Sequence, residues 1–183
     1  MSVARKLLVL DLDETLLFAT VRPLDWQANF LAGSYYVYKR PQVDAFLDAC
    51  FQLFEVAVWT SASPGYASEI VKELFPQPPA FVWAGDRCTQ VYDLELGERF
   101  WVKNLKKIKQ KGYPLESVIM VDDSPEKHGR NYGNLVRVRP FVGDIADNEL
   151  PLLLEYLERL REAENIRVVE KRQWRVEVAS QEP

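Results

Sequence analysis

The sequence predicts an α/β fold, in the form of a three-layer α/β sandwich around a central parallel sheet. Four short apolar runs are typical of strands buried on both faces of a sheet, and segments with apolar residues at helical spacing separate them. Strands and helices that alternate in this way form parallel crossover units, which place helices on both faces of the sheet. The expected strands are residues 7–10, 56–59, 118–121 and 135–138.

The expected helices follow from apolar spacing and from residues that favour helix starts. Pro41 precedes the first helix, and Ser63 followed by Pro64 is typical of a start capped by a hydroxyl group. A basic helix is expected after Lys103, and residues 149–164 have the spacing of an amphipathic helix. The expected helices are therefore residues 43–54, about 63–74, a segment after Lys103, and 149–164.

The length and composition are those of one globular domain. A chain of 183 residues with 48% hydrophobic and 27% charged residues can bury a substantial core but leaves little room for a second one. We expect a single domain over residues 1–165, with short insertions at about 16–39 and 75–101. Residues 166–183 are expected to form a C-terminal tail that adds an edge strand or packs on the surface.

Charge and residue usage argue against several classes of function. The net charge of -4 argues against nucleic-acid binding, since proteins that neutralise many phosphates are usually basic. No apolar stretch approaches the length of a membrane span, and no secretory leader precedes the first strand, so no membrane partner is expected. Only Cys50 and Cys88 are present, which fits a reducing cytoplasm. His128 is the sole histidine, and in a polar loop it is expected to be a bystander.

A polar residue directly follows three of the four expected strands. These residues are Asp11, Thr60 and Asp122. Ligands of open parallel sheets bind at the carboxyl ends of the strands, so the three residues are expected to belong to a single site.

Two carboxylates stand one residue apart after the first strand. Asp11 and Asp13 project to the same side of an extended backbone, while Leu12 turns toward the core. Their mutual repulsion requires a compensating positive charge, such as a divalent cation. A calcium-binding loop fails as an alternative, because Leu16 stands where glycine is needed and Arg22 where glutamate is needed. A plain acidic loop remains an alternative at this point.

Four segments resemble motifs of a known family. Asp11-Leu12-Asp13-Glu14-Thr15 resembles the D-x-D-x-[TV] signature of the haloacid dehalogenase (HAD) superfamily of phosphohydrolases. Its form is typical of the group that dephosphorylates the carboxy-terminal domain of RNA polymerase II, the NLI-interacting-factor-like group. The match recurs from about Lys6 to Leu160. The other matching segments are Val58-Trp59-Thr60-Ser61-Ala62-Ser63, Phe100-Trp101-Val102-Lys103-Asn104-Leu105 and Val121-Asp122-Asp123-Ser124-Pro125.

The resemblance implies catalytic and phosphate-binding roles. Asp11 would attack phosphorus and become an aspartyl phosphate, and Asp13 would protonate the leaving alkoxide and later deprotonate water. Thr60 and Ser61, with neighbouring backbone N–H groups, would hold the phosphate, together with Lys103. Without the resemblance, Ser61 or Ser63 fits the role of a helix cap, and Lys103 fits one member of a solvated, charged helix face.

The resemblance also implies a Mg²⁺ site. Asp122 would bind the metal together with the Asp11 carboxylate and the main-chain carbonyl of Asp13, because hard oxygen ligands suit Mg²⁺. Asp123 is interpreted as a second ligand, an outer-sphere partner or a helix cap. Arg40, in the family's Arg-Pro entry to its first helix, would brace the site or serve the fold.

The two insertions are too short to build an independent lid, so the Rossmann-like, HAD-like fold is expected to have no large cap and an open site. The resembling family has a three-strand insertion in the second interval. Both intervals are rich in aromatic residues, which either grip a peptide or pack locally. These residues are Trp26, Phe30, Tyr35, Tyr36 and Tyr38 in the first interval, and Phe81, Trp83, Tyr92, Phe100 and Trp101 in the second.

The expected function is a Mg²⁺-dependent phosphatase of phosphoserine or phosphothreonine in a protein. An open site admits a protein chain, whereas a lid encloses a small substrate. Two alternatives remain: an open-site phosphatase of small phosphoesters or nucleic-acid ends, and a catalytically silent binding module of the same fold.

Overall fold

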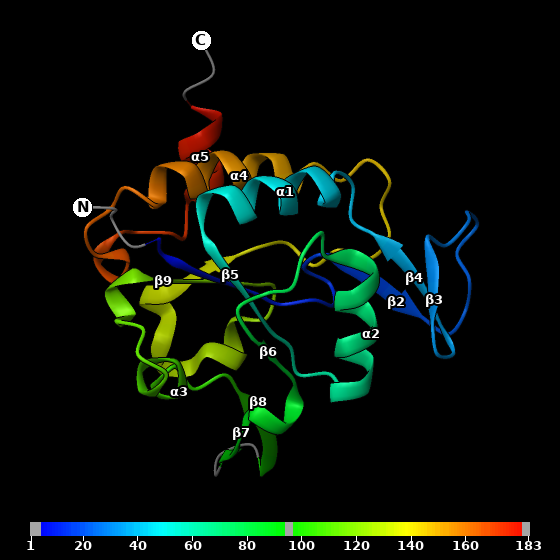
Figure 1. The fold of residues 1–183 in the computed structure, drawn as a ribbon, viewed down its shortest axis with the longest axis horizontal. Helices are drawn as coiled ribbons and strands as arrows, with labels where there is room; N and C mark the ends of the chain where they lie inside the picture. The colour runs from blue at the N-terminus through cyan, green and yellow to red at the C-terminus, as the bar shows by residue number, and fades with distance from the viewer. Residues whose placement is uncertain (1–4, 94–96, 181–183) are drawn as a thin grey trace.

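A computed structural model describes residues 5–93 and 97–180 and has a central five-stranded sheet with helices on both faces (Figure 1). The strand order is β10-β9-β1-β5-β6, and every neighbouring pair is parallel. The prediction of an α/β fold with a parallel sheet is confirmed, with β6 as an edge strand that the sequence did not reveal. The strands are β1 (Leu7–Leu10), β5 (Glu55–Trp59), β6 (Val82–Trp83), β9 (Val118–Asp122) and β10 (Leu135–Arg137).

The sheet separates two buried apolar clusters. Leu8 and Leu10 of β1 belong to the larger cluster, while Leu7 and Val9 face the smaller one, as side-chain alternation along a strand requires. Helices α1, α4 and α5 run along the face of the larger cluster, and α3 covers the opposite face (Figure 1). The helices are α1 (Val43–Leu53), α2 (Pro64–Leu74), α3 (Lys106–Gln110), α4 (Glu149–Leu160) and α5 (Trp174–Ala179).

The helix starts follow the expected residue types, but one helix end does not. Ser63 caps α2 by accepting a hydrogen bond from the backbone N–H of Tyr66 at 3.4 Å, and Pro64 is its first residue. Helix α4 ends at Leu160 rather than at residue 164. The chain instead turns into the 3₁₀ helix η4 (Ile166–Val168), whose first turn is capped by Asn165.

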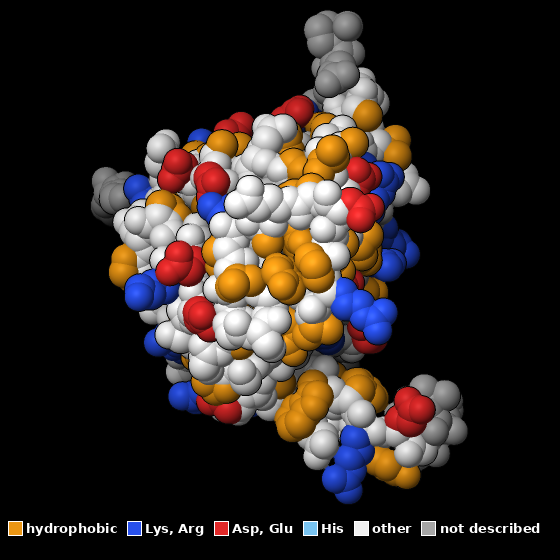
Figure 2. Space-filling model, turned by 90° about the vertical axis from the view of Figure 1, so that its right-hand side faces the viewer, with side chains coloured by type: hydrophobic (Ala, Val, Ile, Leu, Met, Phe, Trp, Pro, Cys, Tyr) orange, Lys and Arg blue, Asp and Glu red, His pale blue; other side chains and the backbone are white. Residues whose placement is uncertain are grey.

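The two insertions form small antiparallel sheets. The first holds β2 (Leu17–Thr20), β3 (Phe30–Ala32) and β4 (Tyr35–Lys39), and the second holds the hairpin β7 (Thr89–Asp93) and β8 (Glu98–Val102). The three-stranded sheet of this chain thus lies in the first interval, whereas the second interval has a two-stranded hairpin. Figure 2 shows the hairpin as a lobe that stands off the body.

The aromatic residues of the two insertions divide between packing and exposure. The buried ring of Tyr38 lies 4.5 Å from that of Trp26, and Trp83 packs edge-on against Trp59 at 4.9 Å. Three others are exposed, and hydrophobic side chains are visible on the hairpin lobe in Figure 2. The exposed aromatic residues are Tyr35, Tyr92 and Trp101. Local packing and surface exposure therefore both occur, in different members of the set.

The edge strand expected in residues 166–183 is wrong for the part that the structure describes. Helix α5 forms there instead, because Trp174 and Val178 lie one turn apart and are both buried. The Trp174 ring packs against Tyr156 of α4 at 5.7 Å, and its indole N–H donates to the Arg137 carbonyl at 2.9 Å. Residues 181–183 lie outside the described part. In that part, no helix is both long enough and apolar enough to span a membrane.

Candidate active site

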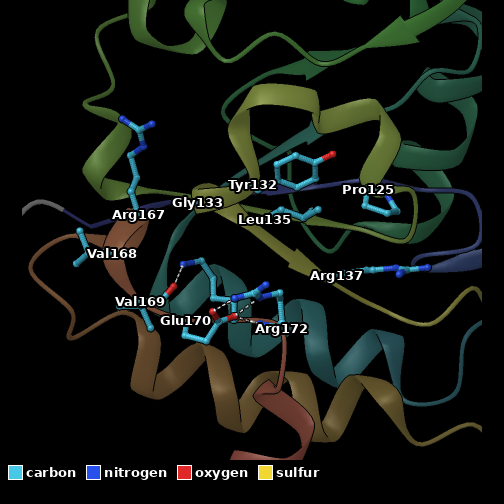
Figure 3. Close-up of a pocket in the computed structure, with 11 residues that line it drawn as sticks. Pro125, Tyr132, Gly133, Leu135, Arg137, Arg167, Val168, Val169, Glu170 and Arg172 are labelled. Atoms are coloured by element: carbon cyan, nitrogen blue, oxygen red, sulfur yellow. Dashed lines mark hydrogen bonds and ion pairs between the residues drawn. The ribbon is translucent and has the colours of Figure 1, made fainter. Parts of the chain in front are cut away.

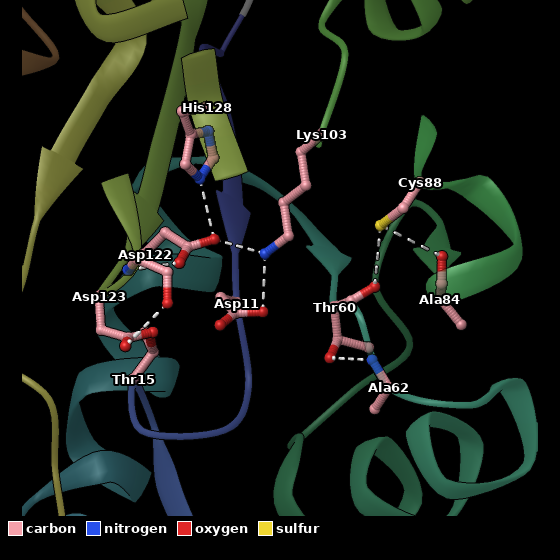
Figure 4. A network of polar contacts seen from close by, with 11 residues as sticks. Asp11, Thr15, Thr60, Ala62, Ala84, Cys88, Lys103, Asp122, Asp123 and His128 are labelled. Atoms are coloured by element: carbon pink, nitrogen blue, oxygen red, sulfur yellow. Dashed lines mark hydrogen bonds and ion pairs between the residues drawn. The ribbon is translucent and has the colours of Figure 1, made fainter. Parts of the chain in front are cut away.

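The carboxyl edge of the sheet brings the three predicted polar residues together. Strand β1 lies between β5 and β9, so Asp11 is flanked by Thr60 on one side and Asp122 on the other (Figure 4). The backbone N–H of Asp11 donates to the carbonyl of Val121 at 3.0 Å, which extends the pairing into the site. Asp11, Thr60 and Asp122 are all buried.

Lys103 lies between the two buried carboxylates. Its ammonium group donates to Asp11 Oδ1 at 2.8 Å and to Asp122 Oδ2, and the whole residue is 1% exposed (Figure 4). The backbone N–H of Lys103 donates to the carbonyl of Lys127 at 2.7 Å, which fixes the segment after β8 to the 3₁₀ segment η3 (Pro125–Asn134). Lys103 is thus separate from the charged face of α3, which begins only at Lys106.

The two carboxylates have opposite electrostatic environments. Burial and the neighbouring Asp122 raise the pKa of Asp11 to about 7. Burial acts in the same direction on Asp122, but the Lys103 ammonium and the hydrogen bond from His128 outweigh it and hold the pKa of Asp122 well below its usual range. The two carboxylates in turn raise the pKa of Lys103 despite its burial. Lys103 therefore stays charged while it bridges two acids of different basicity.

Asp13 lies at the partly exposed side of the site. Tyr66, in the first turn of α2, donates its hydroxyl hydrogen to Asp13 Oδ1 at 2.6 Å. Burial raises the pKa of Asp13, and the hydrogen bond from Tyr66 opposes that rise without cancelling it. A raised pKa favours a protonated carboxyl group, which is the form that can act as an acid.

The loop after Asp13 is held in a strained conformation. Glu14 has a φ of 59°, in the left-handed region that side chains other than glycine rarely adopt. Its carbonyl accepts from the N–H of Phe141 at 2.7 Å, and its N–H donates to the carbonyl of Leu17 at 2.7 Å. Such strain costs on the order of 1 kcal/mol and persists where surrounding contacts impose it, often at functional sites.

Arg40 supports the same loop through a hydrogen bond to its backbone. It is fully buried, donates to the Thr15 carbonyl at 2.9 Å and forms two hydrogen bonds of 2.8 Å with the Asp147 carboxylate. This bidentate pair holds the pKa of Asp147 below its usual range, although partial burial opposes that effect. Arg40 therefore contacts the loop of the site and supports the fold as well.

The variant Asp147→Asn is expected to lose about 2 kcal/mol of the free energy of unfolding at pH 7, because it leaves the buried Arg40 without its anion. Since the pKa of Asp147 is lower in the folded state, its contribution is present above pH ~4 and is lost as the pH falls. Urea unfolding at pH 7 and at about pH 3 measures this contribution. The difference in the free energy of unfolding between the variant and wild type should be smaller at about pH 3. An equal difference at both values would contradict the ion pair.

Asp122 and Asp123 end β9 side by side. Asp122 Oδ1 accepts the backbone N–H of Ser124 at 2.9 Å, while Asp123 accepts from Thr15 at 3.5 Å and from the Ser124 hydroxyl at 3.0 Å. Asp11, Asp122 and Asp123 each offer one carboxylate oxygen, and these oxygens lie within 4.8 Å of one another. Asp123 is thus beside Asp11 and Asp122 rather than remote from them.

The loop after β5 is shaped by backbone contacts. The hydroxyl oxygen of Thr60 accepts from the N–H of Ala62 at 3.1 Å, and the Ala62 carbonyl accepts from the N–H of Gly85 at 2.7 Å. A Cβ on Gly85 would lie 2.7 Å from the Ser61 carbonyl oxygen, so the close approach requires glycine. Ser61 is exposed, and the helix cap is Ser63, as one of the alternatives held.

Two residues of the site escaped the sequence analysis. The expectation that His128 is a bystander is wrong: it is buried, and its Nε2 lies 2.9 Å from Asp122 Oδ2. Because that nitrogen faces a carboxylate, it is assigned the ring proton. Tyr66 is the second, and its position in the first turn of the helix after Thr60 is the only signal for it.

Comparison with known proteins agrees with this architecture. Residues 6–167 match the family model described as NLI interacting factor-like phosphatase. The chain is 31% identical over 184 residues to CTD nuclear envelope phosphatase 1 of Xenopus laevis, covering 91% of this chain and 72% of that protein. It is 30% identical over 171 residues to the human CTD small phosphatase-like protein, of which it spans only 58%.

The fold has a counterpart among solved structures. The structure of Fcp1, an essential RNA polymerase II CTD phosphatase, superimposes with a TM-score of 0.59 at 18% sequence identity. That match covers 96% of this chain and 62% of the Fcp1 chain, and it supports the HAD-like fold. Together with the family match over most of its length, this shows that the chain belongs to the NLI interacting factor-like phosphatase family.

Proposed function

We propose that the chain is a Mg²⁺-dependent phosphatase that removes phosphate from serine or threonine in a protein, through an aspartyl phosphate on Asp11. The observation that supports this most directly is the buried contact of Lys103 with both Asp11 and Asp122 at the carboxyl edge of the sheet. Burial of two acids and one amine carries a desolvation free energy that a fold does not require for its stability. Groups with shifted pKa values cluster at functional sites.

The donor set fits Mg²⁺. The ion prefers octahedral oxygen ligands at 2.0–2.1 Å, so its ligand oxygens lie roughly 3 to 4 Å apart. One carboxylate oxygen each of Asp11, Asp122 and Asp123 lies within 4.8 Å of the others, so small side-chain shifts would bring all three to that spacing. We therefore assign Asp11 and Asp122 as ligands, with the main-chain carbonyl of Asp13, and Asp123 as a ligand or an outer-sphere partner. When bound, Mg²⁺ would neutralise charge on the transferring phosphoryl group.

The chain's own residues divide the remaining chemistry. The carboxylate of Asp11 attacks phosphorus, and the P–O bond to the serine or threonine oxygen breaks as the acyl phosphate forms. The carboxyl group of Asp13 donates its proton to the departing oxygen and then accepts one from the water that hydrolyses the acyl phosphate. Tyr66 holds Asp13 in place for both transfers.

Phosphate recognition is assigned to the residues around Asp11. Lys103 supplies a fixed positive charge, and the Thr60 hydroxyl with the backbone N–H groups of the following loop accommodates the phosphate oxygens. Helix α2 begins at Pro64, so its positive dipole end faces the same side of the sheet. Ser61 is the weakest member of this set, because its side chain is exposed to solvent.

The variant Asp122→Asn is expected to raise the Mg²⁺ concentration at half-maximal activity by about 100-fold or more, since a direct ligand loses its charge. Titration of turnover with Mg²⁺ measures this effect. The matched variant Asp48→Asn, at an exposed position of α1, should titrate as wild type. An unchanged magnesium titration in Asp122→Asn would remove that residue from the ligand set.

The proposed substrate class is supported by relatives whose names identify them as CTD phosphatases and by insertions that form only small antiparallel sheets. A panel of phosphoserine peptides, sugar phosphates, nucleotides and oligonucleotides with terminal phosphates tests the proposal, with Mg²⁺ present. Peptides should give the highest kcat/KM. Preference for any other group would overturn the protein-phosphatase assignment, and absence of turnover even of an aryl phosphate would indicate a silent binding module.

We also place the chain in a reducing compartment such as the cytoplasm. Cys50 and Cys88 are both free and buried. Burial raises the pKa of both thiols, which keeps them in the unreactive protonated form.

A further inference from the structure

A groove runs along the outer edge of β10, and none of the residues assigned to the active site lines it. It consists of a hollow of about 640 Å³ and a second of about 440 Å³, which share Arg137, Lys171 and Arg172 as lining residues. In Figure 3, Tyr132 and Pro125 form one wall, the segment Val169 to Arg172 forms the other, and Leu135 and Arg137 of β10 lie between them.

The groove is basic in a chain whose net charge is -4. Among the lining residues of both hollows, Glu170 is the single acid. The basic lining residues are Arg137, Arg139, Arg167, Lys171, Arg172 and Arg175. Segregation of charge against the overall balance indicates an anionic ligand, because clefts lined by one sign of charge concentrate ions of the other sign.

Part of this positive charge is already used in holding the groove together. Arg172 pairs with Glu170 at 2.7 Å, and Arg175 pairs with Glu149 of α4. The buried ammonium group of Lys171 donates to the carbonyl oxygens of Ile166 and Val169, which fixes the wall formed by that segment. These contacts shape the groove and leave other side chains to meet a ligand.

Three arginines remain free for such a ligand. Arg137, Arg139 and Arg167 are exposed, and none forms an ion pair within the described ranges 5–93 and 97–180. Arg137 and Arg167 lie at opposite ends of the groove in Figure 3. Guanidinium groups bind carboxylates and phosphates with two parallel hydrogen bonds, so they suit both kinds of anion.

The groove begins beside the site. Arg137 pairs in register with Asp122 across neighbouring strands, which lie about 4.8 Å apart in a sheet. Pro125 lines the groove and follows Asp122, Asp123 and Ser124 directly in sequence. A peptide leaving the site over β10 therefore reaches Arg137 within roughly three or four extended residues, and further residues extend along the groove toward Arg167.

We propose that this groove binds an acidic or additionally phosphorylated stretch of the protein substrate, a few residues from the phosphate that is removed. The inference rests on the proposed function, because it assumes that a protein chain enters the site. A concave groove of this volume accommodates a short peptide segment. Charge complementarity thus favours an acidic peptide as the occupant.

The test compares three phosphoserine peptides of equal length in a kinetic assay. One has four acidic residues two to five positions before the phosphoserine, one has them after it, and one has glutamines at all these positions. One acidic peptide is expected to exceed the neutral peptide in kcat/KM by about tenfold, an advantage that should fall as salt screens the charges. The variant Arg137→Gln/Arg167→Gln should lose most of that advantage through KM, with turnover of the neutral peptide unchanged.

The matched control is Lys72→Gln/Lys109→Gln, which removes the same charge from exposed positions on α2 and α3 and should keep the advantage. Equal turnover of all three peptides by wild type, or equal loss in both double variants, would overturn the groove assignment while leaving the phosphatase assignment in place. Phosphatidylserine vesicles offer a further control. If they bind wild type but not the groove variant, and wild type does not discriminate among the peptides, the groove assignment would also be overturned. Absence of turnover of every phosphopeptide would instead overturn the proposed function.

Discussion

Replacement of Asp11 by asparagine is expected to lower kcat for a phosphopeptide by about 10⁴-fold or more, because an amide cannot form the acyl phosphate. The fold should be retained. Burial and Asp122 raise the pKa of Asp11 to about 7, so the structure disfavours its charge, and a neutral residue of equal size relieves the repulsion. The free energy of unfolding in the absence of metal should therefore change by less than about 1 kcal/mol.

Turnover and thermal unfolding of the same preparation separate the two effects of Asp11→Asn. The variant Asp48→Asn removes the same charge from an exposed position and should match wild type in both measurements. Turnover of Asp11→Asn near the wild-type rate would end the nucleophile assignment. A large loss of stability together with lost turnover would show that Asp11 serves the fold.

Replacement of Lys103 by methionine is expected to cost about 3–5 kcal/mol of the free energy of unfolding, since it leaves two buried carboxylates without a cation. Activity should also fall by about 100-fold or more, because a fixed positive charge is lost beside the phosphate. Urea unfolding without metal measures the first effect. Added Mg²⁺ should restore part of the stability by binding to the same carboxylates.

Two further variants test the cause of that loss. In Asp11→Asn/Lys103→Met one of the two carboxylates is neutral, so the double variant should be more stable than the sum of the single effects predicts. Lys109→Met changes an exposed lysine of α3 and should stay within about 0.5 kcal/mol of wild type. Additive effects of the Asp11 and Lys103 changes would contradict a direct electrostatic contact between them.

The sequence predicted the core of the fold because its strands are continuous apolar runs. Leu7 to Leu10 and Val118 to Val121 bury every side chain, so local pattern and tertiary environment agree. Strand β6 was missed because only Val82 and Trp83 form it, too short a run to show any period. The helix in the tail was not expected because the alternation of apolar and polar residues from Val176 to Val178 is typical of a strand. A helix forms instead because it buries Trp174 and Val178 on one face.

The site was predictable where a residue follows a strand and obscure elsewhere. Asp11, Thr60 and Asp122 share one edge because parallel strands share a direction. Lys103 follows a peripheral hairpin, and only the family resemblance distinguished it from the lysines of α3. His128 lies in an irregular 3₁₀ segment that has no period, so no sequence pattern predicts that its ring faces Asp122.

The position of β1 at the centre of the sheet has a consequence for biosynthesis. Both partners of β1 are encoded later, with Leu7 opposite Glu55 on one side and opposite Val118 on the other. As the nascent polypeptide leaves the ribosome, one edge of this apolar strand has no partner until β5 is translated, and the other edge has none until β9 is translated. Such long-range pairing folds slowly and exposes aggregation-prone strands, so chaperone capture of the emerging polypeptide should matter most before β9 is made.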